Sequence, residues 1–204
     1  MNALATTADW VGRLHASVFG AIERWTADWL PGLLARLVFA SVLFAYYLNS
    51  AQTKVGEGVL GFFQLRPGAY IQILGFPALD AVGGDPAALS LFQKLTVLAG
   101  TYAEFALPIL IVIGLFSRLA ALGMMGFIAV QSLVDVTIHE LDEKSIGAPF
   151  DRFPDAIIWD QRMLWLFPLA LIVLRGPGLI SVDRLVFGRR RVAPRDEYAM
   201  QPAE

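Results

Sequence analysis

Glu104 is a carboxylate inside an apolar run, Leu95 to Phe116, and no other position in the sequence points so clearly to chemistry. At 1.5 Å per residue of helix, it lies roughly 13 Å inside the run, close to the midplane of a bilayer. Pro108 has no backbone N–H to donate to the Glu104 carbonyl. The Glu104 carbonyl oxygen therefore lacks its helical partner at the same depth as the carboxylate. Because a lone buried carboxylate is costly, we predict that Glu104 is either a neutral acid or half of an ion pair.

The predicted partner of Glu104 is an arginine from another apolar segment. Arg162 lies roughly 7 Å inside the segment that begins at Ile157, which leaves an axial gap of about 6 Å for its long side chain to bridge. Arg36 lies near the opposite boundary, where its axial gap is about twice as large and its side chain can reach water instead. We therefore predict a Glu104–Arg162 ion pair.

A polar stripe is expected on the apolar segment that ends at Ile138. Gln131 or Ser132, Asp135 and His139 recur at spacings of three and four, so they face one direction on a helix. Asp135 can orient and protonate the His139 ring, an arrangement suited to proton exchange near neutral pH. These residues predict an outward-opening pocket with Glu104 at its floor, Arg162 and Asp135 on its walls, and His139 and Asp160 at its rim. The candidates for catalysis are Glu104, Asp135 and His139, and those for substrate binding are Arg162, Asp160, Arg36, Lys54 and Tyr47.

Simpler roles are open for all of these residues. Polar side chains in membrane helices often do no more than hydrogen-bond to neighbouring helices. His139 can be an ordinary interfacial residue, and Lys54 can be a solvated anchor beyond the first span. Tyr47 can belong to the belt of aromatic residues at the membrane boundary.

Four apolar segments must position these side chains. About twenty apolar residues in a helix cross the hydrocarbon core, and a chain that is 56% hydrophobic and 17% charged is too apolar for a soluble globule of 204 residues. We predict an all-α fold, an integral membrane four-helix bundle over residues 31–186. The path of the 56–94 connection is not predicted, although Ala69 to Leu74 suggests an interfacial or re-entrant piece. The expected spans are residues 33–51, 95–116, 119–138 and 157–174.

The two ends of the chain are expected to lie outside the bundle. Residues 1–30 carry apolar side chains at spacings of three and four, which predicts an amphipathic helix in the membrane interface. Residues 187–204 are expected to be a basic, then disordered, cytoplasmic tail. Ten of the 16 lysines and arginines fall on the side of the two termini and Arg118. The positive-inside rule therefore predicts that both termini are cytoplasmic.

Composition excludes several functions. The balance of 16 basic against 18 acidic residues excludes the electrostatic footprint of a nucleic-acid-binding protein. The absence of cysteine excludes disulfides, thiolate nucleophiles and iron–sulfur ligation. The two histidines, His15 and His139, cannot bind bis-histidine haem within one bundle, and neither a metal site nor a dinucleotide fingerprint is expected. Electrons for any redox reaction must come from a partner.

Two sequence motifs carry a resemblance to a known family. The run from Glu104 through GLFSR at residues 114–118, followed by GPGLISVDRL at residues 176–185, resembles the DoxX family of small bacterial four-helix membrane proteins. Arg36 and Lys54 stand at the positions of that family's first-span arginine and lysine. The resemblance covers residues 33–186, and the WDQR-x-x-W segment at residues 159–165 is similar to a proteobacterial subgroup with a long acidic loop before the last helix.

The resemblance implies redox-associated work in the bacterial inner membrane. Family members include a subunit of a thiosulfate:quinone oxidoreductase and a component of mycobacterial membrane redox complexes. It implies a quinone-docking or accessory subunit that needs a partner, with no covalent cofactor and with quinone as the expected ligand. The expected partners are the lipid bilayer and either another protein or a second copy of the chain. A scaffold without enzymatic activity is the main alternative, and a solute carrier is disfavoured because no repeats are found.

Overall fold

The protein is all-helical in the computed structural model, which describes residues 3–188. Four helical stretches are long and apolar enough to cross a membrane: Leu30–Lys54, Leu91–Ile113, Ser117–Thr137 and Ile157–Arg175. They match the predicted spans to within a few residues at each end, as expected for boundaries drawn from hydropathy. The prediction of a multi-pass, all-α membrane protein is therefore confirmed at the level of its helices.

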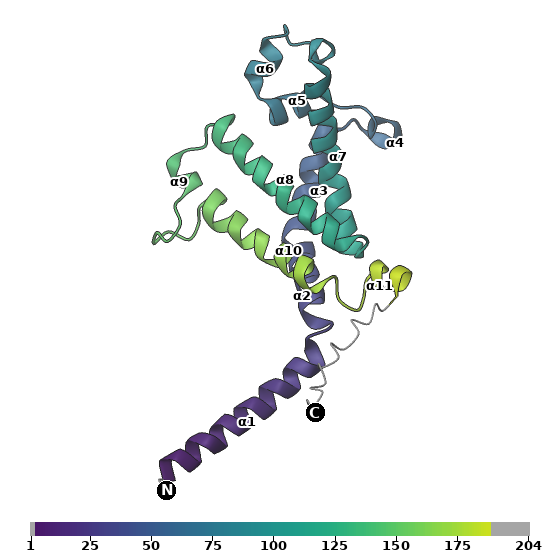
Figure 1. Cartoon of the computed structure of the whole chain (residues 1–204). Helices are drawn as coiled ribbons and strands as arrows, with labels where there is room; N and C mark the ends of the chain where they lie inside the picture. The colour runs from purple at the N-terminus through teal and green to yellow at the C-terminus, as the bar shows by residue number, and fades with distance from the viewer. Residues whose placement is uncertain (1–2, 189–204) are drawn as a thin grey trace, which may run out of the picture.

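The four long helices pack side by side. The first consists of α2 (Leu30–Phe39), a π-helical turn η1 (Ala40–Phe44) and α3 (Ala45–Lys54). It is followed by α7 (Leu91–Ile113), α8 (Ser117–Thr137), and α10 (Met163–Arg175) preceded by the π-helical turn η3 (Ile157–Arg162). Helix α10 packs against α2 and α8, and α7 packs against α3 and α8 (Figure 1). Their shared core includes Phe39, Leu43, Met124, Ile128, Leu169 and Ile172.

The two ends of this group of helices differ. We call them the Lys54 end and the Arg118 end, after residues at the end of α3 and the start of α8. The connection at the Lys54 end folds into α4 (Gly58–Gly61), α5 (Pro67–Leu74), α6 (Phe76–Asp80) and the 3-10 turn η2 (Pro86–Ala88). Helix α5 packs against α3 and α7. Figure 1 shows α5 and α6 beside the first turns of α7, beyond the end of α3. The Ala69–Leu74 piece is thus part of helix α5.

Local capping explains why α7 begins before its apolar run. The Ser90 side chain accepts a hydrogen bond from the Gln93 backbone N–H, and the Gln93 side chain accepts one from the Ser90 N–H. This capping box satisfies donors that a helix start otherwise leaves free. Gly114, with φ of 75°, ends the helix in the left-handed conformation. Before α7, the Asp85 side chain accepts a hydrogen bond from the Ala87 N–H and caps the short turn η2.

Gly32 of α2 and Gly178 of the turn after α10 are required by close contact between their backbones. A Cβ atom added to Gly32 would come within 2.2 Å of the Gly176 carbonyl oxygen. A Cβ atom added to Gly178, where φ is 82°, would come within 2.7 Å of the Trp29 carbonyl oxygen. A side chain at either position would therefore force the chains apart. The turn leads into α11 (Val182–Phe187), which Ser181 caps as its sequence suggests.

Asp183 caps a helix far from it in sequence. Its carboxylate accepts hydrogen bonds from the backbone N–H of Phe116 at 2.6 Å, the backbone N–H of Ser117 at 2.8 Å and the Ser117 hydroxyl at 2.7 Å. These contacts satisfy the start of α8, whose own N-cap residue supplies no side-chain cap. Helix α11 is thereby tied to the turn between α7 and α8.

Asp183→Ala should lower the free energy of unfolding by about 1–2 kcal/mol, because α8 loses its cap. Thermal unfolding of the detergent-solubilised protein measures this loss. Asp80→Ala is the matched control, since Asp80 is exposed at the end of α6 and its carboxylate accepts no hydrogen bond within residues 3–188. Equal effects of the two substitutions would show that the cap contributes nothing.

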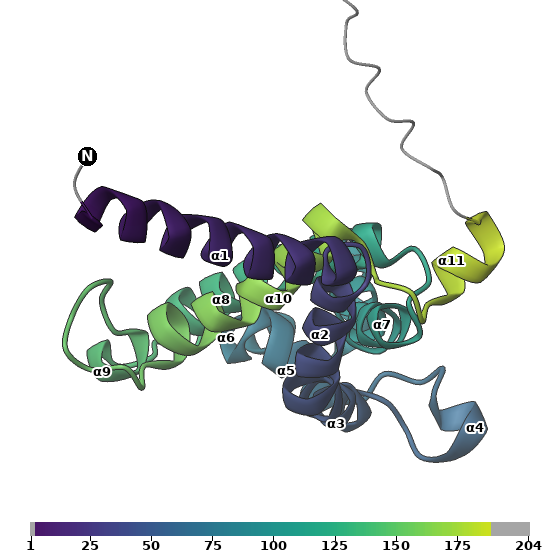
Figure 2. The same cartoon turned by 90° about the horizontal axis from the view of Figure 1, so that it is seen from below.

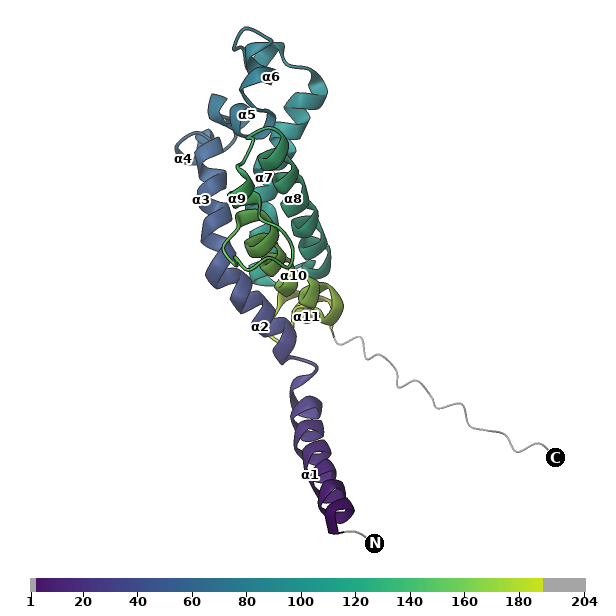
Figure 3. The same ribbon diagram turned by 90° about the vertical axis from the view of Figure 1, so that its left-hand side faces the viewer.

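Helix α1 (Ala3–Thr26) extends away from the four long helices at the Arg118 end (Figures 1 and 3). Figure 2 views the molecule from that end and shows α8 and α10 leaning to the same side of α2. The apolar side chains of α1 are exposed, among them Trp10, Leu14, Val18 and Ile22. Most of the predicted tail lies outside the described residues, which end at 188.

Candidate functional site

A cavity of about 540 Å³ lies between α3, α7 and α8 near the Lys54 end, with α5 against it. This volume is in the range of pockets that hold small molecules, about 300–1,000 Å³. Small and apolar residues of α7 and α8 form most of its wall, including Ala99, Gly100, Ala103, Leu107, Gly123, Gly126, Phe127, Val130 and Val134. Its polar side chains are Ser50, Lys54, Gln72, Thr96, Glu104, Gln131, Asp135 and His139. Glu104, Asp135, His139 and Lys54 thus share one cavity, which we call the Glu104 cavity.

Glu104 forms an ion pair with Lys54. The Lys54 Nζ donates to Glu104 Oε2 at 2.8 Å, and it also donates to the Ser50 hydroxyl at 2.9 Å and the Ser50 carbonyl at 3.2 Å. Lys54 is 3% exposed and Glu104 is 6% exposed, so this pair is shielded from water on most sides. All three ammonium hydrogens therefore have a partner. The alternative that Lys54 is a solvated anchor is wrong.

The predicted pairing of Glu104 with Arg162 is wrong for two physical reasons. The first span continues as a helix to Lys54, three residues beyond its predicted end, so the ammonium group reaches back into the protein. Helix α7 begins at Leu91, and its first turns lie beside α5 and α6, beyond the end of α3 (Figure 1). The depth of Glu104 counted from Leu95 therefore overestimates its distance from the Lys54 end. The carboxylate and the ammonium group consequently lie at one level.

Arg162 neutralises Asp135 instead. Its Nη2 forms an ion pair with Asp135 Oδ2, and its Nη1 donates to the Ser132 hydroxyl at 2.9 Å. Arg162 is 4% exposed, and it is not among the residues that line the Glu104 cavity. Its Nε is buried and has no hydrogen-bond partner within residues 3–188. Arg162 therefore stands behind the cavity wall and compensates the charge of a lining carboxylate.

The predicted contact between Asp135 and His139 does not form. Helix α8 ends at Thr137, so His139 leaves the helical path on which the spacing of four residues would bring the two side chains together. The His139 Nε2 lies 3.1 Å from the Gln72 carbonyl oxygen of α5. Because a carbonyl only accepts hydrogen bonds, this contact requires a hydrogen on Nε2 and leaves Nδ1 as the unused nitrogen. Gln72 was missed by the sequence reasoning, which had no path for the 56–94 connection.

Tyr47 supports the cavity wall. Its side chain is fully buried, and its hydroxyl donates to Gln131 Oε1 at 3.2 Å. The Gln131 Nε2 donates in turn to the Tyr46 hydroxyl at 3.2 Å. One amide N–H of Gln131, a lining residue, is left for a ligand. Tyr47 itself does not line the cavity, so it positions Gln131.

Two other predicted site residues lie elsewhere. Asp160 accepts a hydrogen bond from the Ala156 backbone N–H at 2.9 Å and does not line the Glu104 cavity, so its expected place at the pocket rim is wrong. Arg36 is buried near the Arg118 end, where its Nε donates to the Ile111 carbonyl at 3.0 Å and its Nη1 to the Pro177 carbonyl at 3.1 Å. Arg36 also bonds to the carbonyls of Val112 and Ile180. It is a structural residue, remote from the Glu104 cavity.

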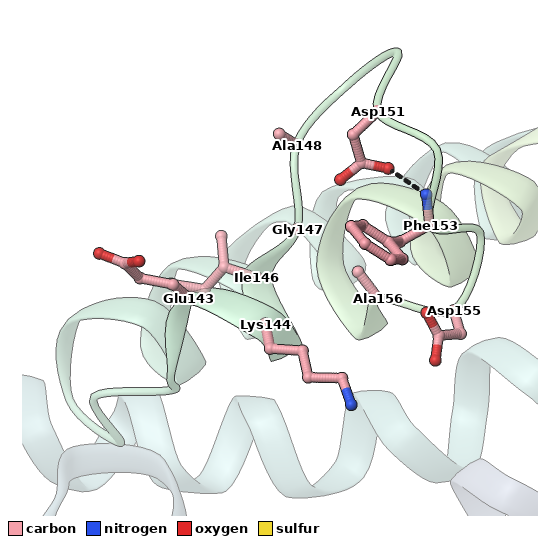
Figure 4. A pocket seen from close by; sticks show the side chains of 9 residues that line it. All are labelled: Glu143, Lys144, Ile146, Gly147, Ala148, Asp151, Phe153, Asp155 and Ala156. Atoms are coloured by element: carbon pink, nitrogen blue, oxygen red, sulfur yellow. Dashed lines mark hydrogen bonds between the residues drawn. The ribbon is translucent and has the colours of Figure 1, made fainter.

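A separate pocket of about 660 Å³ lies in the loop between α8 and α10, around α9 (Glu143–Ile146). Figure 4 shows the side chains of Glu143, Asp151 and Asp155 around it, with Asp151 accepting a hydrogen bond from the Phe153 N–H at 2.8 Å. The backbone N–H of Ser145 donates a hydrogen bond to the nearby Asp142 carboxyl and lowers its pKa. None of these residues lines the Glu104 cavity.

Comparison of the chain with protein-family models, with curated protein sequences and with solved structures gave no match. In the part of the chain that the structure describes, no group of three or more His, Asp or Glu side chains is arranged to hold a metal ion. The Glu104 cavity must therefore be interpreted from its own geometry.

Proposed function

We propose that this chain is a DoxX-like protein of the bacterial inner membrane that docks a quinone headgroup as an accessory subunit of an oxidoreductase. The observation that carries the proposal is the Glu104 cavity, whose apolar wall lies on spanning helices and whose polar groups gather near the Lys54 end. An isoprenoid quinone has the same division, with a polar ring and an apolar tail. Such a ligand can enter from the lipid and leave its tail there.

The free polar groups of the cavity suit the two oxygens of a quinone ring. Gln131 offers one N–H that no protein group uses. His139 offers Nδ1, which donates a hydrogen bond when the ring is charged and accepts a proton when the ring is neutral. Full reduction of a bound quinone would take up two electrons and two protons. His139 can pass protons between the ring and water, because it is exposed and lies beyond the end of α8.

The buried ion pairs set the charge of the cavity. Lys54 pairs with Glu104 and Arg162 pairs with Asp135, so each carboxylate lies next to a cationic side chain and the two pairs add no net charge to the membrane. The chain has no cysteine and two histidines, so the electrons must come from a partner protein. The bilayer and that partner complete the proposed assembly, and a second copy of the chain can be a further subunit of it.

The same proposal includes a topology. We infer a four-helix membrane bundle with both termini in the cytoplasm, supported by the ten of 16 basic residues on the side of Arg118. The exposed apolar side chains of α1 support its place in the membrane interface. The Glu104 cavity then lies toward the periplasmic side.

Purification in a mild detergent, followed by quinone extraction and identification of co-purifying proteins by mass spectrometry, tests the function. We expect quinone in the extract of the wild-type protein and a redox partner in the complex. If a defined partner co-purifies while quinone neither co-purifies nor binds on addition, the quinone function is wrong.

Gly126→Leu should block quinone binding without unfolding the protein. A Cβ atom added to Gly126 meets nothing within 4 Å, so the new side chain occupies open space at the cavity wall. We expect quinone affinity to fall by about ten-fold or more, equivalent to about 1.4 kcal/mol, and the melting temperature to stay or rise because glycine is a poor helix former. Gly12→Leu in α1, where a Cβ atom also meets nothing within 4 Å, is the matched control. Equal quinone titrations for the two variants would contradict the proposed site.

A membrane scaffold is the second candidate function, and the loop around α9 favours it. Phe150 in this loop is fully exposed, and Phe153 is largely exposed and lines the same pocket as the carboxylates of Figure 4. Exposed aromatic residues next to acidic groups are suited to docking a basic partner. The scaffold predicts that Gly126→Leu leaves all measured functions intact, whereas Phe150→Ser releases the partner.

A further inference from the structure

A second cavity, of about 760 Å³, lies at the Arg118 end and is separate from the Glu104 cavity. Three arginines line it from three elements: Arg118 from the start of α8, Arg175 from the end of α10 and Arg184 from α11. Trp25 and Trp29, at the junction of α1 and α2, line the same space. We call it the arginine cavity.

The three guanidinium groups are free to bind an anion. Within residues 3–188, none of them forms an ion pair or donates a side-chain hydrogen bond. Two carboxylates also line the cavity, Asp28 and Asp183. Asp183 is occupied by its three hydrogen bonds to Phe116 and Ser117, so its oxygens already have donors. The arginines therefore outnumber the one carboxylate, Asp28, that lacks such donors.

The backbone shapes one side of this cavity. Arg118 lies over Gly176, where an added Cβ atom would stand 3.5 Å from the Arg118 Nη2. Gly176, with a φ of 81°, is part of the turn whose backbone packs closely against α2. The guanidinium of Arg118 thus rests on a rigid part of the fold. Because the Arg118 side chain is already held in place, it loses less conformational entropy when an anion binds.

The arginine cavity lies where the apolar spans end, the level at which lipid headgroups are expected. Arg118 is the second residue of one spanning helix and Arg175 is the last residue of another, so both stand where the apolar spans end. Tryptophan side chains such as Trp25 and Trp29 favour this boundary. Basic pockets between spanning helices at the cytoplasmic boundary are suited to anionic headgroups, because arginine binds phosphate oxygens in a bidentate manner.

We propose that the arginine cavity binds the phosphate of an anionic phospholipid, held by Arg118, Arg175 and Arg184 with Trp25 and Trp29 beside the headgroup. This site is independent of the proposed quinone function. It would fix α1 and α11 against the start of α8 through a lipid molecule, since all three elements contribute lining residues.

Native mass spectrometry of the full chain tests the proposal, after reconstitution in nanodiscs with equal amounts of phosphatidylglycerol and phosphatidylcholine. We expect the wild-type protein to retain phosphatidylglycerol with about ten-fold preference, and Arg118→Gln/Arg175→Gln to lose that preference. The control Arg13→Gln/Arg66→Gln removes the same charge from exposed positions outside the cavity and should retain it. Arg118→Lys/Arg175→Lys keeps the charge and should retain part of it.

Three results would overturn the proposal: no preference in the wild-type protein, equal loss in the cavity and control variants, or displacement of the lipid by millimolar inorganic phosphate. The last result would mean that the cavity recognises phosphate alone and that the lipid is not its specific ligand. Melting temperatures of the variants identify any loss that is due to unfolding. If the Gln variant unfolds, the lipid content of Arg118→Lys/Arg175→Lys tests the proposal. This variant must retain more phosphatidylglycerol than Arg118→Gln/Arg175→Gln if the site exists.

Discussion

Arg36→Met should lower the free energy of unfolding by an amount on the order of 5 kcal/mol. One guanidinium satisfies four backbone carbonyls, those of Ile111, Val112, Pro177 and Ile180. Two of these carbonyls belong to the last turn of α7, where the Ile111 carbonyl also accepts a hydrogen bond from the Gly114 N–H at 3.2 Å, and the others to the turn after α10. Each hydrogen bond to a charged group contributes about 1.5–3 kcal/mol, and the losses are not fully additive.

The measurement is thermal unfolding of the variants in one detergent. Arg36→Lys should recover little of the loss, because an ammonium group cannot reproduce the planar fork of donors that arginine presents. Arg13→Met is the control, since Arg13 is exposed on α1, and it should cost less than about 0.5 kcal/mol. A melting temperature for Arg36→Lys close to that of the wild-type protein would show that charge alone suffices.

Glu104→Gln should destabilise the protein by about 3–5 kcal/mol, because it leaves the Lys54 ammonium group buried without an anion. The second substitution Lys54→Met, made in the Glu104→Gln background, should restore most of this stability by removing the orphaned charge. The four proteins of this double-mutant cycle are compared by thermal unfolding.

A matched control exists in the exposed pair between Glu57 and Arg66. Their side chains are 3.2 Å apart and 94% and 44% exposed, so Glu57→Gln should cost less than about 1 kcal/mol. If Glu104→Gln is as mild as Glu57→Gln, the buried pair does not hold α3 against α7. If Lys54→Met adds to the loss instead of relieving it, the two residues do not act as a pair.

Sequence patterns predicted the helices well because hydropathy and helix length are local properties. The four spans and the position of Glu104 inside one of them follow from apolar runs of about twenty residues. The predicted span 95–116 extends three residues past the end of α7, because Gly114 ends the helix in the left-handed conformation although the apolar run continues to Phe116.

The partners of the polar residues could not be predicted in the same way, because they depend on how far each helix slides past its neighbour. Lys54 meets Glu104 only because α7 extends past α3 at the Lys54 end. Arg162 at the end of η3 meets Asp135 of α8. The depth of Arg162 in the membrane cannot by itself distinguish this contact from one with Glu104 of α7. Gln72 reaches His139 through α5, whose path depends on a long glycine- and proline-rich connection.

A quinone ring held in the Glu104 cavity must contact residues of α7 and α8. Photo-crosslinking of the membrane-embedded protein with a light-activated quinone analogue, followed by peptide mapping, tests this contact most directly. We predict labels on residues 99–107 of α7 and 123–135 of α8, removed by excess natural quinone and absent from Gly126→Leu but present in Gly12→Leu. Labels confined to other surfaces, or labels on the cavity that excess quinone does not remove, would contradict the account.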